Sequence, residues 1–355
     1  MIRQVNFRGY LEGFRQTHYH QFLTPNHRGE NDQTRYLWSR TLGAPARESV
    51  QHVSPDIRFT HAVTRNPTRS AAFAERAGLK LTAHYDDVLA DPGIDGIVLA
   101  TPHSRHHGEM LAAARAGKHV FVEKPITLSR SDAEDALATV ADAGLVLGIG
   151  FGRRFTPSFR ELMRRLHRGE IGEVLHVEGH SSGPSGYRLT VDNWRSNRIE
   201  SPAGAMTARG IHALDLMIAT AGPVTSVFCR SEHRAIDVAL DDTTSASLGF
   251  SSGATGTLTT LFATADLWRV QVFGTKGWME VQDDVRLVLR DLAACTTTLE
   301  FNPIDKERAA LEAFGRAIRG DQQFPIAASD AINGIAALEA MVASAASGQA
   351  VAIQP

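Results

Sequence analysis

The chain has 355 residues, a formal net charge of −2 at neutral pH and 43 % hydrophobic residues. This length predicts two domains, and the apolar content excludes a disordered chain. The near-neutral charge and the lack of an apolar run of ~20 residues give no indication of a nucleic-acid partner or a membrane span. Arg3 and Arg8 precede no apolar segment, so we expect no secretory signal. Cys229 and Cys295 form no CxxC motif, and we expect a cytoplasmic protein.

Residues 1–56 are rich in Arg, His, Asn and Gln and show little hydrophobic periodicity. We predict one short strand from Arg35 to Leu42 and one short helix from Ala46 to Val53. The rest of this segment has no pattern that favours a regular element.

From Ile57 onward, apolar strands alternate with amphipathic helices. Asn66 and Pro67 are suited to begin the first of these helices, as cap and first residue, and glycines end this helix and the helices 104–116 and 129–143. The predicted strands are 57–63, 79–83, 94–100, 119–122 and 145–151, and the predicted helices are 67–76, 86–89, 104–116 and 129–143. This alternation with short connections is typical of a doubly wound parallel sheet in an α/β fold.

After Phe151 the pattern changes to runs of strands. The predicted elements are helix 157–167, strand 174–181, helix 207–221, strands 224–232, 244–250, 254–262, 269–273 and 278–282, and helices 306–319 and 327–347. Strands without intervening helices indicate a mainly antiparallel open sheet. We therefore predict a second domain of α+β type, with the boundary near Phe151.

The stretch His119–Pro125 ends a buried strand with Glu123, Lys124 and Pro125. Ligands of an open parallel sheet bind beyond the carboxyl ends of its strands, so Lys124 is expected to face the ligand crevice. The alternative is a solvated Glu–Lys pair before an ordinary loop.

Four motifs occur in an order and spacing that resemble the Gfo/Idh/MocA family, the glucose–fructose oxidoreductase and inositol dehydrogenase group. They are Ala100-Thr101-Pro102, Glu123-Lys124-Pro125, Trp194-Arg195 and Gly210-x-His212-x-x-Asp215. The resemblance covers residues 57–355. It implies a Rossmann domain (57–151) and a C-terminal substrate and oligomerisation domain (152–355), whose last helices pack back on the Rossmann domain. It also implies a homodimer or homotetramer that transfers hydride between NAD(P) and a sugar, polyol or related hydroxyl or carbonyl compound.

The resemblance implies catalytic roles for Lys124, which would hold the reacting oxygen and move its proton, and for His212 as a second proton carrier. The alternative for His212 is a helix histidine satisfied within the core. Many members carry an aspartate four residues before this histidine, where this chain has Ala208. Asp215 lies three residues after His212 and could orient its ring or only brace a loop.

Cofactor selection is expected after the second strand, at Thr64, Arg65 and Asn66. Arg65 could pair with a 2′-phosphate, which favours NADP over NAD, or it could be a surface arginine near a helix start. The other expected cofactor contacts are Ala100, Thr101, Pro102, His103, His106, Glu123, Pro125, Trp194 and Arg195. The expected substrate contacts are Tyr187, Asn193, Arg209 and Asp215. No bound metal is expected, because the histidines at 103, 106 and 107 have no further ligand nearby.

The glycine-rich turn of a Rossmann domain, G-x-G-x-x-G, is absent before Ile57, and Gly43 lies in the nearest candidate. Residues 1–56 are therefore interpreted as an atypical head, in which the first β-α unit is remade or lost. An altered reading frame or start would also produce such a head. Three hypotheses follow: an NADP-preferring dehydrogenase or reductase, a catalytically silent relative that binds a ligand and regulates a partner protein, or a product defective in cofactor binding.

Overall fold

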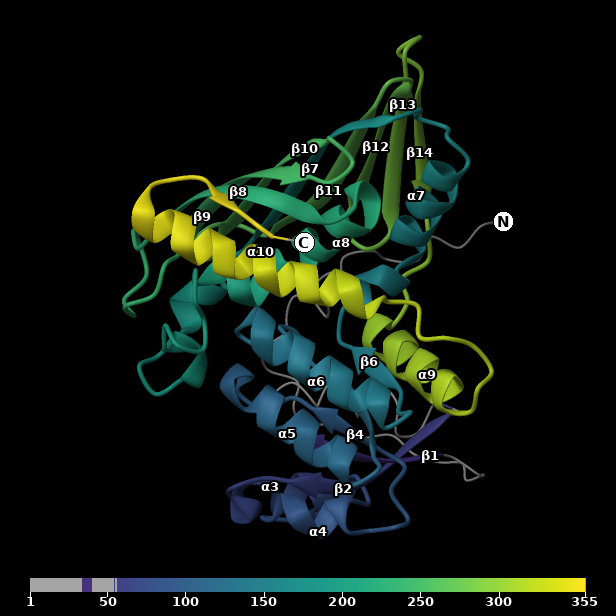
Figure 1. Cartoon of the computed structure of the whole chain (residues 1–355), viewed down its shortest axis with the longest axis vertical. Coiled ribbons are helices and arrows are strands. Elements are labelled where there is room, and N and C mark those ends of the chain that lie inside the picture. Colours follow the sequence, from purple (N-terminus) through teal and green to yellow (C-terminus); the bar gives the residue numbers. More distant parts are fainter. Residues whose placement is uncertain (1–33, 40–53, 55, 355) are drawn as a thin grey trace, which may run out of the picture.

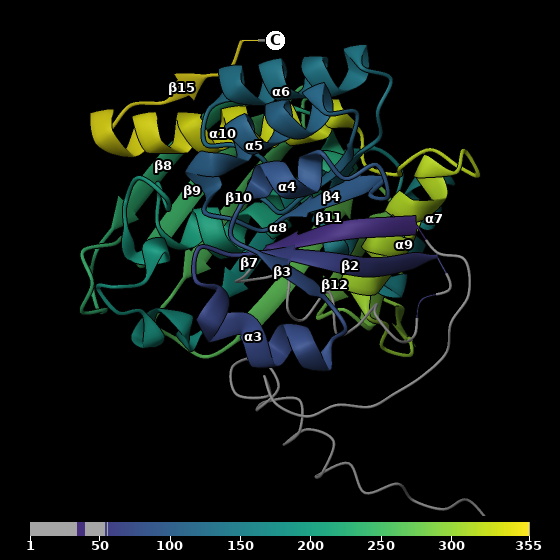
Figure 2. The ribbon, with the colours of Figure 1, turned by 90° about the horizontal axis from the view of Figure 1, so that it is seen from below.

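We describe a computed structural model of the chain, in which residues 34–39, 54 and 56–354 are placed. Six parallel strands form the first sheet, in the order β3-β2-β1-β4-β5-β6, as predicted for a Rossmann-type domain (Figures 1 and 2). Their bounds are β1 (Thr34–Ser39), β2 (Ile57–Val63), β3 (Lys80–Thr82), β4 (Gly96–Leu99), β5 (His119–Val122) and β6 (Leu147–Ile149).

The central strand β1 corrects one expectation. It pairs in parallel with β2, where Thr34 is opposite Ile57, and with β4, where Tyr36 is opposite Gly96. The interpretation that the first strand of the sheet is lost is therefore wrong. The segment is rich in aromatic and β-branched residues, which favour strands, and in this position it pairs the backbone groups of both neighbours. The predicted helix 46–53 and the turn at Gly43 lie outside the described residues.

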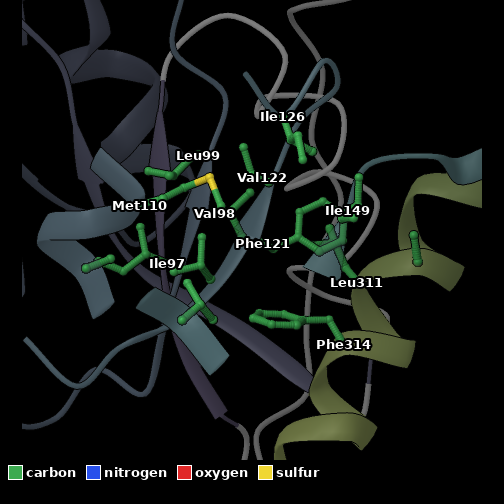
Figure 3. Packing of buried hydrophobic residues seen from close by; sticks show 14 of the residues in the cluster. Ile97, Val98, Leu99, Met110, Phe121, Val122, Ile126, Ile149, Leu311 and Phe314 are labelled. Carbon is green, nitrogen blue, oxygen red and sulfur yellow. The ribbon is translucent and has the colours of Figure 1, made fainter. Parts of the chain in front are cut away.

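Helices cover both faces of this sheet. They are α3 (Pro67–Arg76), α4 (Tyr85–Leu89), α5 (His103–Arg115), α6 (Arg130–Asp142) and, from the end of the chain, α9 (Lys306–Ile318). Figure 3 shows Met110 of α5 on one side of the strands and Phe314 of α9 on the other. The ring of Phe314 is fully buried and packs edge-on against Phe121, with 5.6 Å between the centroids. Because both faces are covered, β4 is buried along its whole length, as is usual in parallel sheets.

The second sheet has nine strands in the order β14-β13-β12-β11-β7-β10-β9-β8-β15, and its pairs are antiparallel except β7–β10. The bounds are β7 (Val174–Ser182), β8 (Val224–Glu232), β9 (Thr243–Phe250), β10 (Thr255–Leu261), β11 (Leu267–Gly274), β12 (Gly277–Gln282), β13 (Arg286–Asp291), β14 (Thr296–Glu300) and β15 (Val351–Ala352). The sequence did not predict β13, β14 and β15. β13 and β14 lie at one edge with mostly exposed or half-buried side chains, so they lack the apolar alternation that marks a strand.

The remaining helices are α7 (Pro157–His167), α8 (Ile211–Ala221) and α10 (Ala328–Ser347). Helix α10 crosses the middle of the molecule, between the nine-stranded sheet and α6 (Figure 1). A π-helical turn, η4 (Met206–Gly210), precedes α8, where the sequence predicted one continuous helix. Short 3₁₀ turns are η1 (Gly152–Phe155), η2 (Pro184–Arg188) and η3 (Trp194–Ser196). Among the described helices, none combines the length and apolarity that crossing a membrane requires.

Candidate active site

Lys124 directly follows β5 and joins the two halves of the molecule. Its Nζ donates a 2.7 Å hydrogen bond to the backbone carbonyl of Ala208, which lies in η4. The residue is half-buried, so the solvated Glu–Lys pair considered above does not describe it. π-helical turns are rare and are often found at functional sites. Here the turn presents the backbone carbonyl oxygen of residue 208 to the lysine.

The surroundings of Lys124 lower the pKa of its amine to about 8. Burial is the main cause that lowers the pKa of its amine below the ordinary lysine value, and Arg195, Arg153 and Arg209 lower it further. Glu123 is the opposing charge. An amine with a lowered pKa can exchange a proton near neutral pH, which an ordinary lysine does poorly.

His212 lies on the first turn of α8, with its ring edge-on to Phe151 at 6.2 Å between the centroids. Burial, and then Lys124, Arg153 and other cations, hold the pKa of its imidazole well below the usual value. Its Nδ1 is buried and has no hydrogen-bond partner among the described residues. A buried polar atom without a hydrogen bond costs free energy, so this neutral ring is suited to form a hydrogen bond to a ligand oxygen through Nδ1.

Asp215 was expected to touch the substrate or to orient His212, and the structure contradicts both roles. Its side chain is only 3 % exposed, and its two carboxylate oxygens accept 2.8 Å hydrogen bonds from Nε and Nη2 of Arg154. Arg154 also contacts Asp330 at 2.9 Å. Asp215 therefore braces η1 against α8, which is the structural alternative considered for it.

The ends of β4 and β5 are tied together by His106. Its Nδ1 lies 2.9 Å from the carbonyl oxygen of Pro125, and its Nε2 lies 3.1 Å from that of Thr101. The ring is fully buried, and burial lowers its pKa. The expectation that His106 touches the cofactor is therefore wrong, because both nitrogens face the chain itself. Ala100 and His103 are also buried, at 1 % and 5 % exposed.

A loop from the second half of the chain is fixed to the N-terminus of α5 by Glu200. This carboxylate, 9 % exposed, accepts hydrogen bonds from the backbone N–H of Ser104 at 3.0 Å and from its hydroxyl. The carbonyl oxygen of Glu200 lies 2.6 Å from Nδ1 of His103, whose pKa is lowered to about 3 by burial. The carboxylate thus accepts from donors at the N-terminus of α5, where the helix itself provides no acceptor and its dipole favours a negative charge.

Trp194 and Arg195 belong to the same loop. The indole of Trp194 packs edge-on against His103 at 4.9 Å, and the guanidinium of Arg195 lies 4.2 Å above the indole. The Nε1 of Trp194 is buried without a partner among the described residues. Asn193, expected to touch substrate, accepts the backbone N–H of Arg195 at 3.0 Å and so shapes this loop.

Thr64, Arg65 and Asn66 follow β2, at the same edge of the sheet as Lys124 but separated from β5 by β1 and β4. Thr64 is buried, whereas Arg65 and Asn66 are exposed. The exposed Tyr187 donates to the carbonyl oxygen of Ala263 at 3.1 Å. The structure thus brings Lys124, His212, Trp194, Arg195 and Arg209 to one region and puts the Thr64 group farther along the crevice.

Glu123 lies against Gly150, where a Cβ added to the glycine would come within 2.9 Å of the carboxylate. Glu123 and Glu307 of α9 line a cavity of about 10 Å³, enough for one water molecule. Burial raises the pKa of Glu123, Glu307 raises it further, and Lys124 opposes both. Glu123 therefore supports the strand end behind Lys124.

Arg153 is a site residue that the sequence reasoning missed. Its Cζ lies 3.5 Å above the ring of Trp268, and its Nη1 contacts Asp284 at 2.6 Å. Lys306 contacts the same carboxylate. Arg153 follows the last strand of the parallel sheet, so the rule that singled out Lys124 could have found it. Asp284 and Lys306 are far apart in sequence and gave no such signal.

Two family models match this chain: the NAD-binding Rossmann-fold oxidoreductase family GFO_IDH_MocA over residues 40–151, and the GFO/IDH/MocA C-terminal domain over residues 159–280. The 1,5-anhydro-D-fructose reductase of Ensifer adhaerens is 27 % identical, over 81 % of this chain and 88 % of that protein. The NAD⁺-dependent scyllo-inositol 2-dehydrogenase of Bacillus subtilis is 42 % identical, over 26 % of this chain and only 27 % of that protein. A levoglucosan dehydrogenase solved with NADH and levoglucosan has the same fold, with a TM-score of 0.82 and 19 % identity, covering 91 % of this chain and 100 % of that one.

Proposed function

The chain belongs to the Gfo/Idh/MocA family of NAD-binding oxidoreductases, and we propose that it transfers hydride between a nicotinamide cofactor and a sugar, polyol or related hydroxyl or carbonyl compound. The observation that carries this proposal is that Nζ of Lys124, at the carboxyl end of β5, is hydrogen-bonded to Ala208, four residues before His212, whose buried Nδ1 has no partner among the described residues. The relatives named above are dehydrogenases and a reductase, which favours an enzyme over the catalytically silent alternative.

The described residues fit the ring end of a nicotinamide dinucleotide. The strand order reverses between β1 and β4, and dinucleotides bind at such a switch point. The buried, unpartnered Nε1 of Trp194 offers a donor to a polar ligand group there. We propose that Thr101, Pro102 and Trp194 hold the nicotinamide end and that Arg65 reads a 2′-phosphate, giving a preference for NADP. The bound nicotinamide supplies the hydride acceptor or donor.

The chain itself supplies the proton path. In the oxidation direction, the substrate hydroxyl donates to the neutral Nζ of Lys124, which takes the proton as the carbon loses hydride. In the reduction direction, protonated Lys124 gives that proton back to the oxygen. The carbonyl of Ala208 fixes Nζ in both directions, and Nδ1 of His212 makes a second hydrogen bond to the substrate.

We further propose that the chain divides by role near Phe151, with 57–151 for cofactor and 152–355 for substrate and self-association, and 1–56 as an atypical head that supplies the central strand β1. The nine-stranded sheets of two copies would pack against each other in a homodimer or homotetramer, and the protein would act in the cytoplasm. The outward residues of β9 and β10 are mostly small and polar, which suits a sheet face that packs against a copy of itself.

Lys124→Met tests the proposed function. In assays of NADP⁺ reduction with a panel of sugars and polyols, kcat should fall roughly 10²- to 10⁴-fold, because a positioned proton carrier is lost. The Kd for NADPH should change little, since the lysine faces the reacting oxygen. Lys276→Met, at an exposed turn, is the matched control. A Lys124 variant that keeps near-full kcat would remove this lysine from the mechanism.

A further inference from the structure

Resting on the proposed function, we infer that the substrate carries an acidic group, as in a sugar acid or a sugar phosphate, and that Arg209 binds this group. Arg209 lies in η4, next to the carbonyl of Ala208 that holds Lys124. A substrate whose reacting oxygen is at Lys124 therefore passes close to the guanidinium.

The guanidinium of Arg209 has N–H donors that its present contacts do not use. Its Nη2 donates one short hydrogen bond, 2.7 Å, to the carbonyl oxygen of Ser182. Its other contacts are long, 3.4 Å to Oγ of Ser185 and 3.3 Å to a carboxylate oxygen of Asp266, which is 75 % exposed. No described residue accepts from its Nε. A guanidinium has five N–H donors, and an exposed, loose ion pair contributes little, so this side chain can take up a bidentate anion.

The charges nearest His212 are cations. The charged groups with the largest effect on the pKa of His212 are Lys124, Arg153, Lys306 and Arg209. Asp284 is shared between Arg153 and Lys306, and Glu123 opposes Lys124. Among the described carboxylates, Arg209 has only the 75 % exposed Asp266 opposite it, so an acidic substrate group can replace this carboxylate at the guanidinium.

Trp268, which lies under Arg153, carries a further donor without a hydrogen-bond partner among the described residues. The residue is 7 % exposed, and this donor, Nε1, is buried. Leaving a buried donor unpaired is costly, and the several acceptor oxygens of an acidic sugar derivative could satisfy it.

Gly183 provides a way to move Arg209 without removing its charge. A Cβ at position 183 would meet Oδ1 of Asp266 and would come within 2.5 Å of Nη1 and 2.7 Å of Nη2 of Arg209, so it would displace both members of this loose ion pair. The backbone there is extended, with φ of 171°, so alanine can adopt it. Gly183→Ala should therefore displace the guanidinium and leave the fold in place.

The test compares gluconate and glucitol 6-phosphate with neutral glucitol as substrates of the full chain with NADP⁺. We expect kcat/KM for at least one acidic compound to exceed that for glucitol roughly 10-fold or more. Arg209→Met should lower the value for the acid by roughly 10- to 100-fold, and the value for glucitol much less. Gly183→Ala should act in the same direction. Arg234→Met, which removes a 68 % exposed arginine away from the cleft, is the charge-matched control.

Three results would overturn the inference. Glucitol could be the best substrate, or Arg209→Met could reduce all three compounds equally. The variant could also weaken NADPH binding, measured by fluorescence, as much as it weakens turnover of the acid; the arginine would then serve the cofactor phosphates. Hydride transfer to NADP⁺ from neutral polyols alone would leave the proposed function intact. Binding of NADPH without transfer from any sugar, polyol or acid would refute the proposed function, and the inference with it.

Discussion

Glu200→Ala should loosen the contact between the loop 193–201 and the N-terminus of α5. The carboxylate is 9 % exposed and accepts two hydrogen bonds from Ser104. Hydrogen bonds to charged groups contribute about 1.5–3 kcal/mol each, and a carboxylate at a helix N-terminus adds about 0.3–1 kcal/mol. Because water can enter the truncated site and satisfy part of what is lost, we expect a net destabilisation of about 3 kcal/mol.

Urea unfolding followed by tryptophan fluorescence measures this change, and amide hydrogen exchange shows whether it is local to α5. Glu200→Gln keeps the shape and one acceptor oxygen but not the charge, so it should cost about half as much. Glu232→Ala removes a 53 % exposed carboxylate with a 3.9 Å partner and is the control. If the unfolding free energy of Glu200→Ala lies within ~0.5 kcal/mol of the wild-type value, the packing of Trp194 holds the loop and the carboxylate of Glu200 does not.

Three further predictions concern single residues. Burial lowers the pKa of His103 from 6.5 to about 3, so below pH 6.5 the unfolded chain binds a proton at this residue that the folded chain does not bind. The unfolding free energy should be full above pH 6.5 and fall by about 1.4 kcal/mol per pH unit on acidification towards pH 3. In acid-unfolding experiments, His103→Asn should reduce this slope. Gly204 has φ of +54°, and a Cβ added there would clash with the carbonyl of Asp241, so Gly204→Ala should lower the unfolding free energy by about 3 kcal/mol. Gly253 has φ of +88° and open space around it. The control Gly253→Ala should therefore lower the unfolding free energy by only about 1 kcal/mol. Arg65→Ala should weaken NADPH binding by roughly 10-fold or more and barely affect NADH; equal losses for both would show that Arg65 does not read the 2′ position.

The sequence predicted the elements whose apolar pattern is set by burial. The parallel strands from Ile57 onward, except the short β3, and the strands β7 to β12 are buried on at least one face, so their periodicity carries the fold. β13 and β14 form an exposed edge, where the pattern is weak. β1 is central, yet it has polar and aromatic residues in place of a run of valine and isoleucine, so its pattern predicted only an isolated short strand and not the middle of a sheet.

The candidate site was predicted in part. The position of Lys124 follows from the geometry of parallel sheets, but its partner Ala208 is 84 residues away and could not be inferred. The same holds for Glu200, 96 residues from Ser104. Asp215 was misjudged because helical spacing says which residues share a face, not which partner a side chain chooses. Arg154, from another element, offers Asp215 two hydrogen bonds that His212 could not.

The cations of the cleft affect the protonation of Lys124. Burial lowers the pKa of its amine, Arg195, Arg153 and Arg209 lower it further, and Glu123 opposes them. The ammonium group therefore releases its proton more readily than an ordinary lysine does. An acidic substrate bound at Arg209 would bring negative charge close to Nζ and stabilise the ammonium form. The substrate would thus strengthen the base at the moment when the hydroxyl proton must be taken.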